Sequence, residues 1–413
     1  MQSRPLARRL MWFFSIVYAV EGVCQAKSGI VWLPLTYFLK QTQGWDPVQV
    51  SVSLAVLDVP WIIKPLYGLV SDFIPLFGYR RRYYLLGANV AGIASFAAVG
   101  ILSQPAALIS ALTVTSIAMA ISSTQCGAIL VETGHKLGGS ARFVNQQWLW
   151  YNIAQMAAVL LGGGLLEFLP PLASLHTAAW VAAAAPLSIL AAALLVPEDR
   201  TALNLQAFRS RARALLDAFR TPALWMVAGF LFLYYFSPGF GTPLYYQMTD
   251  RLGFSQAFIG LLSSVNAGGW IIGGVLYQWK LAALPTLVLL KLSILAGVVA
   301  TLAYLVLFGP VSAVFIWLLG GISSMIATIA TLSLAAEACP DGAEGFAFAG
   351  LMSIINLASP AADMIGSVLY ERVFARSLTP LIVVSAAATA LVCLLLPLAT
   401  RGSGRRAGIP AAD

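Results

Sequence analysis

Long apolar stretches, separated by short polar loops, occupy almost the whole chain. An α-helix needs about 20 residues to cross the hydrocarbon core of a membrane. Twelve stretches of the sequence reach that length. We therefore predict an all-α membrane protein with twelve transmembrane helices, at approximately 11–39, 47–74, 83–102, 107–133, 142–167, 174–196, 221–248, 255–277, 284–307, 311–337, 345–370 and 378–399.

The longest polar segment, 197–220, lies between the sixth and seventh predicted helices. Its leucines and phenylalanines alternate with arginines, which predicts an amphipathic helix on the inner membrane surface. The segment divides the chain into an N-terminal six-helix bundle, 1–196, and a C-terminal six-helix bundle, 221–413, which ends in a short cytoplasmic tail.

The two halves also resemble each other in sequence. The segment 34–45 matches 243–254, and at the same offset Trp61-Ile62-Ile63 matches Trp270-Ile271-Ile272. A constant offset across a helix, a loop and the next helix favours a true repeat over the shared composition of membrane helices. The prediction is therefore two pseudosymmetric halves, with a substrate site between them near the bilayer midplane.

Composition and charge indicate how the chain is oriented in the membrane. Only 10% of the residues are charged, mean hydropathy is +0.85 and the net charge is +8. The basic residues gather in alternate loops, as cytoplasmic loops require, so both termini are expected in the cytoplasm and nucleic acid is not expected as a partner. The short basic N-terminus runs directly into an apolar stretch, which indicates a first helix of a multi-pass inner-membrane protein in contact with lipid, and not a cleaved signal.

The sequence lacks the motifs that are typical of several kinds of chemistry. The four cysteines are far apart and form no CxxC pair, and the two histidines form no HExxH motif. A GxxxxGK[ST] phosphate-binding loop is also missing. We therefore expect no disulfide framework, no metal, no cofactor, no ATP hydrolysis and no enzymatic activity.

The segment Pro60–Arg82 carries the most informative motif. Its order Gly68…Ser71-Asp72…Gly78-Tyr-Arg-Arg-Arg82 resembles a lengthened form of the loop between the second and third helices of the major facilitator superfamily. Three further segments resemble the folate–biopterin transporter family of that superfamily: Phe236–Tyr246, Cys339–Gly345 with Leu351–Leu357, and Leu130-Val131-Glu132. The resemblance implies the major facilitator fold and proton-coupled uptake of folates, pteridines or similar compounds.

The fourth predicted helix departs from the family pattern. Family members usually carry aspartates before the Val-Glu that ends this helix, whereas this chain has Ser122–Gly127 there and only Glu132 is acidic. The resemblance therefore implies the fold, and it leaves folate specificity open.

Glu21, near the middle of the first predicted helix, is the leading candidate for a functional acid. On insertion scales, the placement of one ionisable side chain inside the membrane costs roughly 2.5–3.5 kcal/mol. Each such residue is therefore expected to have a structural or functional role. Tyr18, Glu21 and Gln25 share one helical face by their spacing. Glu21 could exchange a proton or accept two hydrogen bonds from a pterin edge; the alternative is a structural pair with Lys27 or Lys64.

The second predicted helix carries Asp58 and Lys64, which lie on different faces and should not pair with each other. Asp58 is a further candidate for a proton or pterin contact. Lys64 could hold a substrate anion or neutralise an acidic residue on another helix. Pro60 and Pro65 are expected to bend this helix.

Other polar residues inside the membrane could line the cavity or form hydrogen bonds between helices. In the fifth predicted helix Trp148, Asn152 and Gln155 follow Asn145 on one face, which suits a planar heteroaromatic ligand. In the second half, Pro238–Pro243 predicts a broken helix, and the candidates there are Tyr234, Tyr235, Asn266, Asn356 and Asp363.

A second group of charged residues lies at the cytoplasmic ends of the helices. It could latch the inner gate of the transporter, or it could serve membrane orientation alone. The acid Asp72 favours the gate, because orientation has no use for it. The residues of this predicted cytoplasmic gate are Asp72, Arg80, Arg81, Arg82 and Glu132.

Together these patterns predict a monomeric secondary transporter that works by alternating access. Its expected substrate is a folate, a pterin or a similar planar organic anion, imported with protons. Two alternatives remain: a transporter or exporter of another small amphipathic compound, and a non-transporting membrane assembly factor on the same fold.

Overall fold

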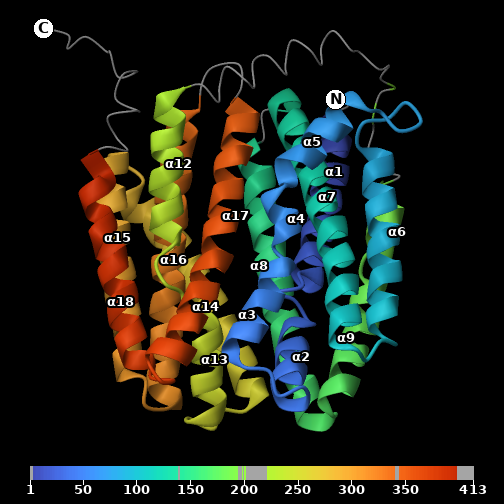
Figure 1. Ribbon diagram of the computed structural model, residues 1–413. Helices are drawn as coiled ribbons and strands as arrows, with labels where there is room; N and C mark the ends of the chain where they lie inside the picture. Colours follow the sequence, from blue (N-terminus) through green and yellow to red (C-terminus); the bar gives the residue numbers. More distant parts are fainter. Residues whose placement is uncertain are drawn as a thin grey trace, which may run out of the picture. The chain divides into compact units, whose positions relative to one another are not determined.

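The computed structural model describes residues 3–137, 140–193, 198, 200, 221–339 and 344–397, and the side chains of most of them (Figure 1). In these ranges the regular elements are all helices, and the only β-type pairing is an isolated bridge between Leu76 and Tyr79. Among these described residues, eight helices are long and apolar enough to cross a membrane. The predicted all-α membrane fold is confirmed.

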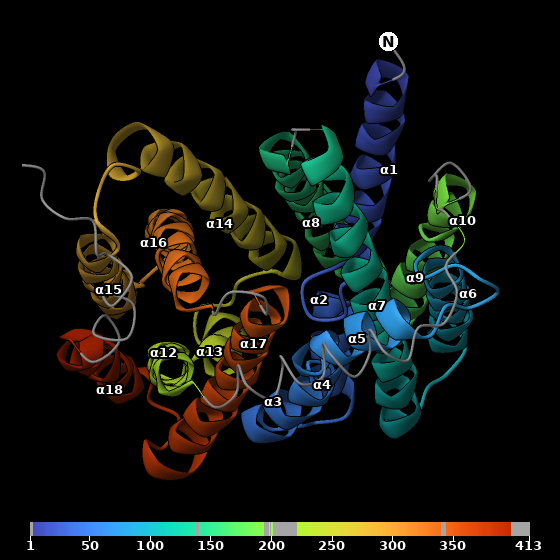
Figure 2. The same ribbon diagram turned by 90° about the horizontal axis from the view of Figure 1, so that it is seen from above.

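The chain forms two compact units. The first comprises Met1–Leu205 and Ser255–Ser264. Within it α1 packs against α7 and α8, and α5 and α6 pack against α7 (Figure 2). Its helices are α1 (Ser3–Cys24), α2 (Trp32–Tyr37), α3 (Pro47–Val56), α4 (Val59–Ile62), α5 (Lys64–Phe73), α6 (Arg82–Val99), α7 (Pro105–Leu137), α8 (Ser140–Phe168), α9 (Pro171–Ala184) and α10 (Leu187–Ala193), with a π-helical turn at Phe38–Thr42.

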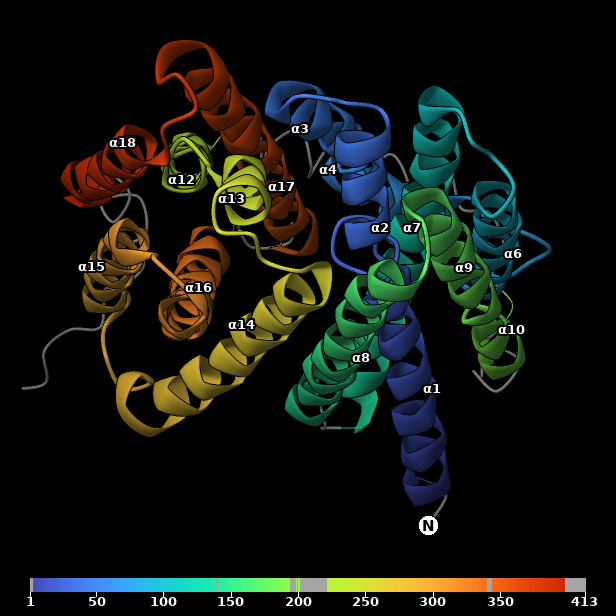
Figure 3. The ribbon, with the colours of Figure 1, turned by 90° about the horizontal axis from the view of Figure 1, so that it is seen from below.

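The second unit comprises Gln206–Phe254 and Val265–Asp413. Here α15 packs against α16 and α18, and α12 packs against α16 and α17 (Figure 3). Its helices are α12 (Pro222–Tyr235), α13 (Gly241–Asp250), α14 (Gln256–Leu276, of which the first part belongs to the other unit), α15 (Thr286–Ala303), α16 (Pro310–Ala338), α17 (Glu344–Val368) and α18 (Leu378–Leu391), with short π or 3₁₀ turns at Tyr277–Leu281, Tyr304–Val306, Leu369–Val373 and Val392–Leu395.

Three of the predicted helices of the first half are interrupted, and one of them, 174–196, consists of α9 and α10. The expected helix 11–39 is wrong as one continuous element, because it breaks between Cys24 and Trp32. The expected helix 47–74 consists of α3, α4 and α5, and a proline stands in the first turn of each of them. Proline lacks the backbone N–H of a helix interior, so the predicted bends at Pro60 and Pro65 are confirmed.

The seventh predicted helix breaks in the equivalent place, between Tyr235 and Gly241, as the glycines and prolines of that segment predict. Each break is packed in the same manner. A Cβ added at Gly162 of α8 would overlap the carbonyl oxygen of Ile30, and one added at Gly366 of α17 would overlap that of Gly239. Ile30 and Gly239 occupy matching positions in the sequence repeat. The repeat therefore extends to the way each broken helix is held.

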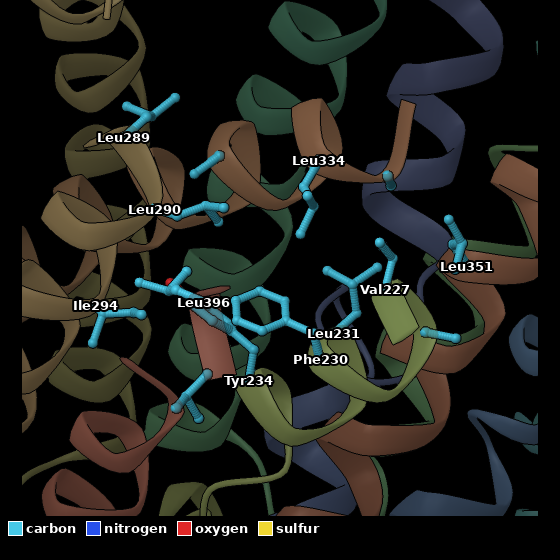
Figure 4. Close-up of a cluster of buried hydrophobic side chains, with 14 of the residues drawn as sticks. Val227, Phe230, Leu231, Tyr234, Leu289, Leu290, Ile294, Leu334, Leu351 and Leu396 are labelled. Carbon is cyan, nitrogen blue, oxygen red and sulfur yellow. The ribbon is translucent and has the colours of Figure 1, made fainter. Parts of the chain in front are cut away.

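The core of the second unit forms around α12 (Figure 4). Burial of such side chains stabilises the bundle by roughly 25 cal/mol per Å² of apolar surface relative to water, although lipid-facing surface gains nothing in this way. The labelled members are Val227, Phe230, Leu231, Tyr234, Leu289, Leu290, Ile294, Leu334, Leu351 and Leu396.

The amphipathic helix predicted at 197–220 lies outside the described residues, apart from Glu198 and Arg200. It stays a prediction. Glu198 nevertheless has a defined place in the first unit, described below.

Gly162 and Gly366, against which the broken helices pack, should not tolerate an added methyl group. We expect Gly162→Ala and Gly366→Ala to lower the unfolding temperature of the purified protein in detergent. Their Cβ atoms would press on backbone rather than on a flexible side chain, and overpacking of this kind costs about 1–3 kcal/mol. Gly164→Ala and Gly350→Ala are the controls, because no atom lies within 4 Å of an added Cβ there. Equal unfolding temperatures for all four variants would contradict this packing.

Candidate functional site

Ser123 on α7 joins an acid of α1 to a base of α5. The Lys64 ammonium donates to Ser123 Oγ at 2.9 Å, and Ser123 Oγ donates to Glu21 Oε1 at 3.2 Å. The three side chains meet because α1 and α5 both pack against α7. Lys64 also lies over the ring of Trp61, at 5.0 Å from the centroid. Lys64 is thus placed beside an acid of another helix, one of the alternatives that the sequence left open.

The second carboxylate oxygen of Glu21 has fewer hydrogen-bond partners than the first. Oε2 is buried and accepts no hydrogen bond from the described residues. Around Glu21, Tyr18 contacts the Cys126 thiol and Tyr151 contacts the Ser28 hydroxyl. The carboxylate thus has one neutral hydrogen-bond donor and one nearby cation.

A second acid–base pair lies at the break between α1 and α2. Lys27 Nζ contacts Asp58 Oδ2 at 2.5 Å, and both side chains are mostly buried. Lys27 belongs to the break and Asp58 directly precedes α4. Asp58 therefore does not pair with Lys64, as predicted, and its cation comes from the break between α1 and α2.

Gln25 directly follows the last residue of α1, and its backbone N–H still donates to the carbonyl of Glu21 at 3.1 Å. Its carbonyl accepts from Gly29 N at 2.7 Å and helps to shape the break. The place of its side chain beside Tyr18 and Glu21 stays a prediction.

The polar stripe predicted on the fifth helix lies on α8. Asn152 donates to the carbonyl of Trp148 at 2.7 Å, within the same helix, and the Trp148 ring is 40% exposed in edge contact with Tyr151. The backbone of Gln155 lies against Gly22, where α1 and α8 approach closely. Their contact with a substrate stays a prediction.

Three of the second-half candidates form hydrogen bonds between helices. Tyr234 donates to Ser293 Oγ at 3.0 Å, Tyr235 is bonded to Thr331 Oγ1 at 2.9 Å, and Asn266 donates to the carbonyl of Trp317 at 3.1 Å. Tyr234 belongs to the apolar core of Figure 4. These contacts favour the structural alternative for all three. Asn356 lies on α17, and its role stays a prediction.

Asp363 of α17 holds the start of α13. Its carboxylate accepts from Thr242 N at 3.1 Å and from Thr242 Oγ1 at 2.6 Å. An acid at a helix N-terminus satisfies backbone N–H groups that have no partner within the helix. Asp363 therefore fixes the second half of the broken helix, a role that its sequence position beside Pro360 did not reveal.

The predicted cytoplasmic gate contains one compact cluster. Arg81 is 6% exposed and contacts Asp72 at 2.5 Å, Ser71 Oγ at 2.9 Å and Gln125 Oε1 at 3.4 Å. These residues come from α5, α7 and the turn before α6. The turn itself is tight, with Phe77 and Gly78 at positive φ, as Gly78 predicts.

Glu198 closes this cluster from the other side, and sequence reasoning missed it. Its carboxylate accepts from the backbone N–H groups of Arg80, Arg81 and Arg82 at 2.7, 2.8 and 2.9 Å. Successive amides at the start of a helix form an anion-binding site, here occupied by a side chain. The available signal was an isolated Pro-Glu-Asp directly after the sixth predicted helix.

The remaining members of the predicted gate are less closely tied to it. The guanidinium of Arg82 lies over the Tyr79 ring at 5.1 Å, and Arg80 contributes its backbone amide. Glu132 lies in α7, outside the residues whose side chains are described. Across the described residues no group of His, Cys, Asp and Glu could hold a metal ion.

Solved transporters share this fold. The chain matches a D-xylose-proton symporter with a TM-score of 0.71 over 94% of this chain and 97% of that one, at 14% identity. It matches the nucleoside transporter NupG with a TM-score of 0.70 over 94% of this chain and 99% of that one, also at 14% identity. At such identities the likeness shows the major facilitator fold.

Curated relatives place the sequence more narrowly. A folate-biopterin transporter of Synechocystis sp. is 31% identical over 371 residues, which cover 86% of this chain and 73% of the relative. Folate transporter 1 of Plasmodium falciparum is 23% identical over 87% of this chain and 73% of its own length. The model of the BT1 family matches residues 25–400, and the chain is a member of the BT1 family of folate-biopterin transporters.

Proposed function

We propose that this transporter imports a folate, a pterin or a similar planar organic anion together with protons, by alternating access. The observation that carries the proposal is the Glu21–Ser123–Lys64 cluster, which places an acid and a base side by side within the membrane-spanning first unit. The family supports the substrate class, because its named members carry folates and biopterin. We further propose a monomer in the cell inner membrane with both termini in the cytoplasm.

The candidate residues divide between two tasks in this proposal. Glu21 and Asp58 serve as proton or pterin contacts and Lys64 binds the substrate anion, while Trp148, Asn152 and Gln155 offer a ring and amides to a planar ligand. Asp72, Arg81 and Glu198 hold the turn before α6 and so act in the cytoplasmic gate.

A second candidate function has one observation in its favour. Lys64 is bonded to Ser123, within the segment Ser122–Gly127 that lacks the aspartates implied by the family resemblance, so the charge pattern of the site differs. Import or export of another small amphipathic compound is the alternative that this difference supports.

Uptake tests the substrate class. Cells that produce the protein are expected to accumulate labelled folate or a simple pterin above cells with an empty vector, and each compound should compete with the other. Lys64→Gln should lower folate uptake about tenfold or more, because a hydrogen bond to a charged group is worth about 1.5–3 kcal/mol. Absence of uptake and of competition by both compounds would leave the alternative function.

The cytoplasmic cluster makes a separate prediction. Asp72→Asn and Glu198→Gln should lower the maximal rate of uptake several-fold with little change in KM, because neither residue is placed at the substrate. The control is Glu371→Gln, which breaks an exposed contact with Arg376 of the kind that contributes little. A raised KM at unchanged maximal rate would contradict the gate role.

A further inference from the structure

Away from the cytoplasmic cluster around Arg81, four half-buried charged side chains of the first unit, two of each sign, are paired in different ways. Lys27 and Asp58 are in direct contact at 2.5 Å, so each charge is compensated by the other. Glu21 and Lys64 are instead separated by a hydroxyl group. Glu21 and Lys64, which Ser123 bridges, can therefore exchange partners without the separation of two ions in direct contact.

The Ser123 hydroxyl can bridge Glu21 and Lys64, and it can also let them separate. A hydroxyl group has one proton to donate and lone pairs that accept, so it can accept from Lys64 and donate to Glu21 at the same time. The other oxygen of Glu21, Oε2, is buried and accepts no hydrogen bond from the described residues. An ionised carboxylate with so few donors is costly in a low-dielectric interior, which favours its taking up a proton.

The groups around Glu21 leave Lys64 as its only charged neighbour in the described part of the unit. From α1 comes Tyr18, from α7 Cys126 and from α8 Tyr151, all of which are ordinarily neutral at physiological pH. The third helix that packs against α1, α10, has no titratable residue. The cluster is therefore neutral when Glu21 is ionised and carries one positive charge when Glu21 is protonated.

We propose that Glu21, Ser123 and Lys64 form a proton-operated anion site, in which a proton on Glu21 frees Lys64 to bind a carboxylate of the substrate. This inference rests on the proposed function and deepens it. One proton enters with one negative charge of the substrate, so the loaded site is neutral again. When the proton leaves, Glu21 competes for Lys64 and the carboxylate is released.

The neutral side chain of Ser123 makes the binding of Lys64 depend on the protonation of Glu21. A permanent carboxylate at this position would hold Lys64 whether or not Glu21 were protonated. With serine there, Glu21 is the only carboxylic acid beside Lys64 among the described residues, and the Cys126 thiol nearby is ordinarily neutral. Uptake of a substrate with a carboxylate should therefore depend on Lys64 more strongly than uptake of a pterin without one.

Uptake of labelled folate and of a pterin without a carboxyl group tests this inference across a range of pH. In the wild-type protein folate uptake should rise as the external pH falls. Glu21→Gln should abolish this rise while exchange of external for preloaded folate continues, since glutamine imitates the protonated acid. Ser123→Asp should lower folate uptake about tenfold, the effect of about 1.4 kcal/mol, and should lower pterin uptake much less.

Ser123→Asn is the matched control for Ser123→Asp, because it has the same shape without the charge and can still accept from Lys64. It should keep the rise of folate uptake at low pH. The inference is overturned if Glu21→Gln keeps the pH dependence, if Asp58→Asn rather than Glu21→Gln removes it, or if Ser123→Asp lowers folate and pterin uptake equally. Elution of each purified variant as a single species checks that it folds.

A binding measurement separates this inference from the proposed function. Benzoate and folate are added to the purified protein in mildly acidic and in mildly alkaline buffer, and the unfolding temperature is recorded. Both should raise it more in acid, and neither should do so in Lys64→Gln. If the wild type transports neither folate nor pterin but shows this stabilisation, the proposed substrate is wrong and the anion site stands. If transport occurs and carboxylates stabilise equally at both pH values, the site as proposed is wrong.

Discussion

A polar group inside the bilayer has no water to bind, so every charge and every free backbone N–H there needs a partner from the protein. The first unit meets this constraint with two acid–base pairs, one direct and one through Ser123. The second unit meets it with Asp363, whose carboxylate satisfies the start of α13. Both solutions lie beside a broken first helix, where backbone groups are released and need such partners.

The two units share a scaffold and differ in their chemistry. Gly162 and Gly366 let each broken helix lie close against its neighbour, and this contact is the same in both halves. The charged residues are not repeated: Lys64 has Gly273 as its counterpart at the offset that relates Trp61 to Trp270. The ion pairs of the first unit are therefore additions to a duplicated frame, and they mark the half in which we place proton and anion binding.

The sequence was sufficient to predict the helical membrane fold, the broken seventh helix and the family. Apolar length and the positions of proline and glycine report directly on these features. The separation of Asp58 from Lys64 was also predicted, although the continuous helix on which that prediction rested is interrupted between them at Ile63. The break at Gln25 was missed, since the stretch 11–39 has no proline before Pro34 and its apolar pattern continues through the break.

Contacts between segments that are distant in the chain could not be predicted from the sequence, for a physical reason. Whether Lys64 meets Glu21, and whether a serine lies between them, depends on the rotation and tilt of three helices, which spacing within one helix does not fix. Glu198 is more remote still, because its partners are backbone amides that every sequence possesses. Polar residues that bind backbone leave little signature until the fold places them.

The central claim is that Glu21 carries the proton that accompanies a substrate anion. It is tested most directly by proteoliposomes that contain the purified protein and a pH-sensitive dye, with folate added outside. Our account predicts that folate entry acidifies the lumen of vesicles with the wild-type protein, and that Glu21→Gln exchanges folate without any acidification. Equal acidification by the two proteins for the same amount of folate would contradict it.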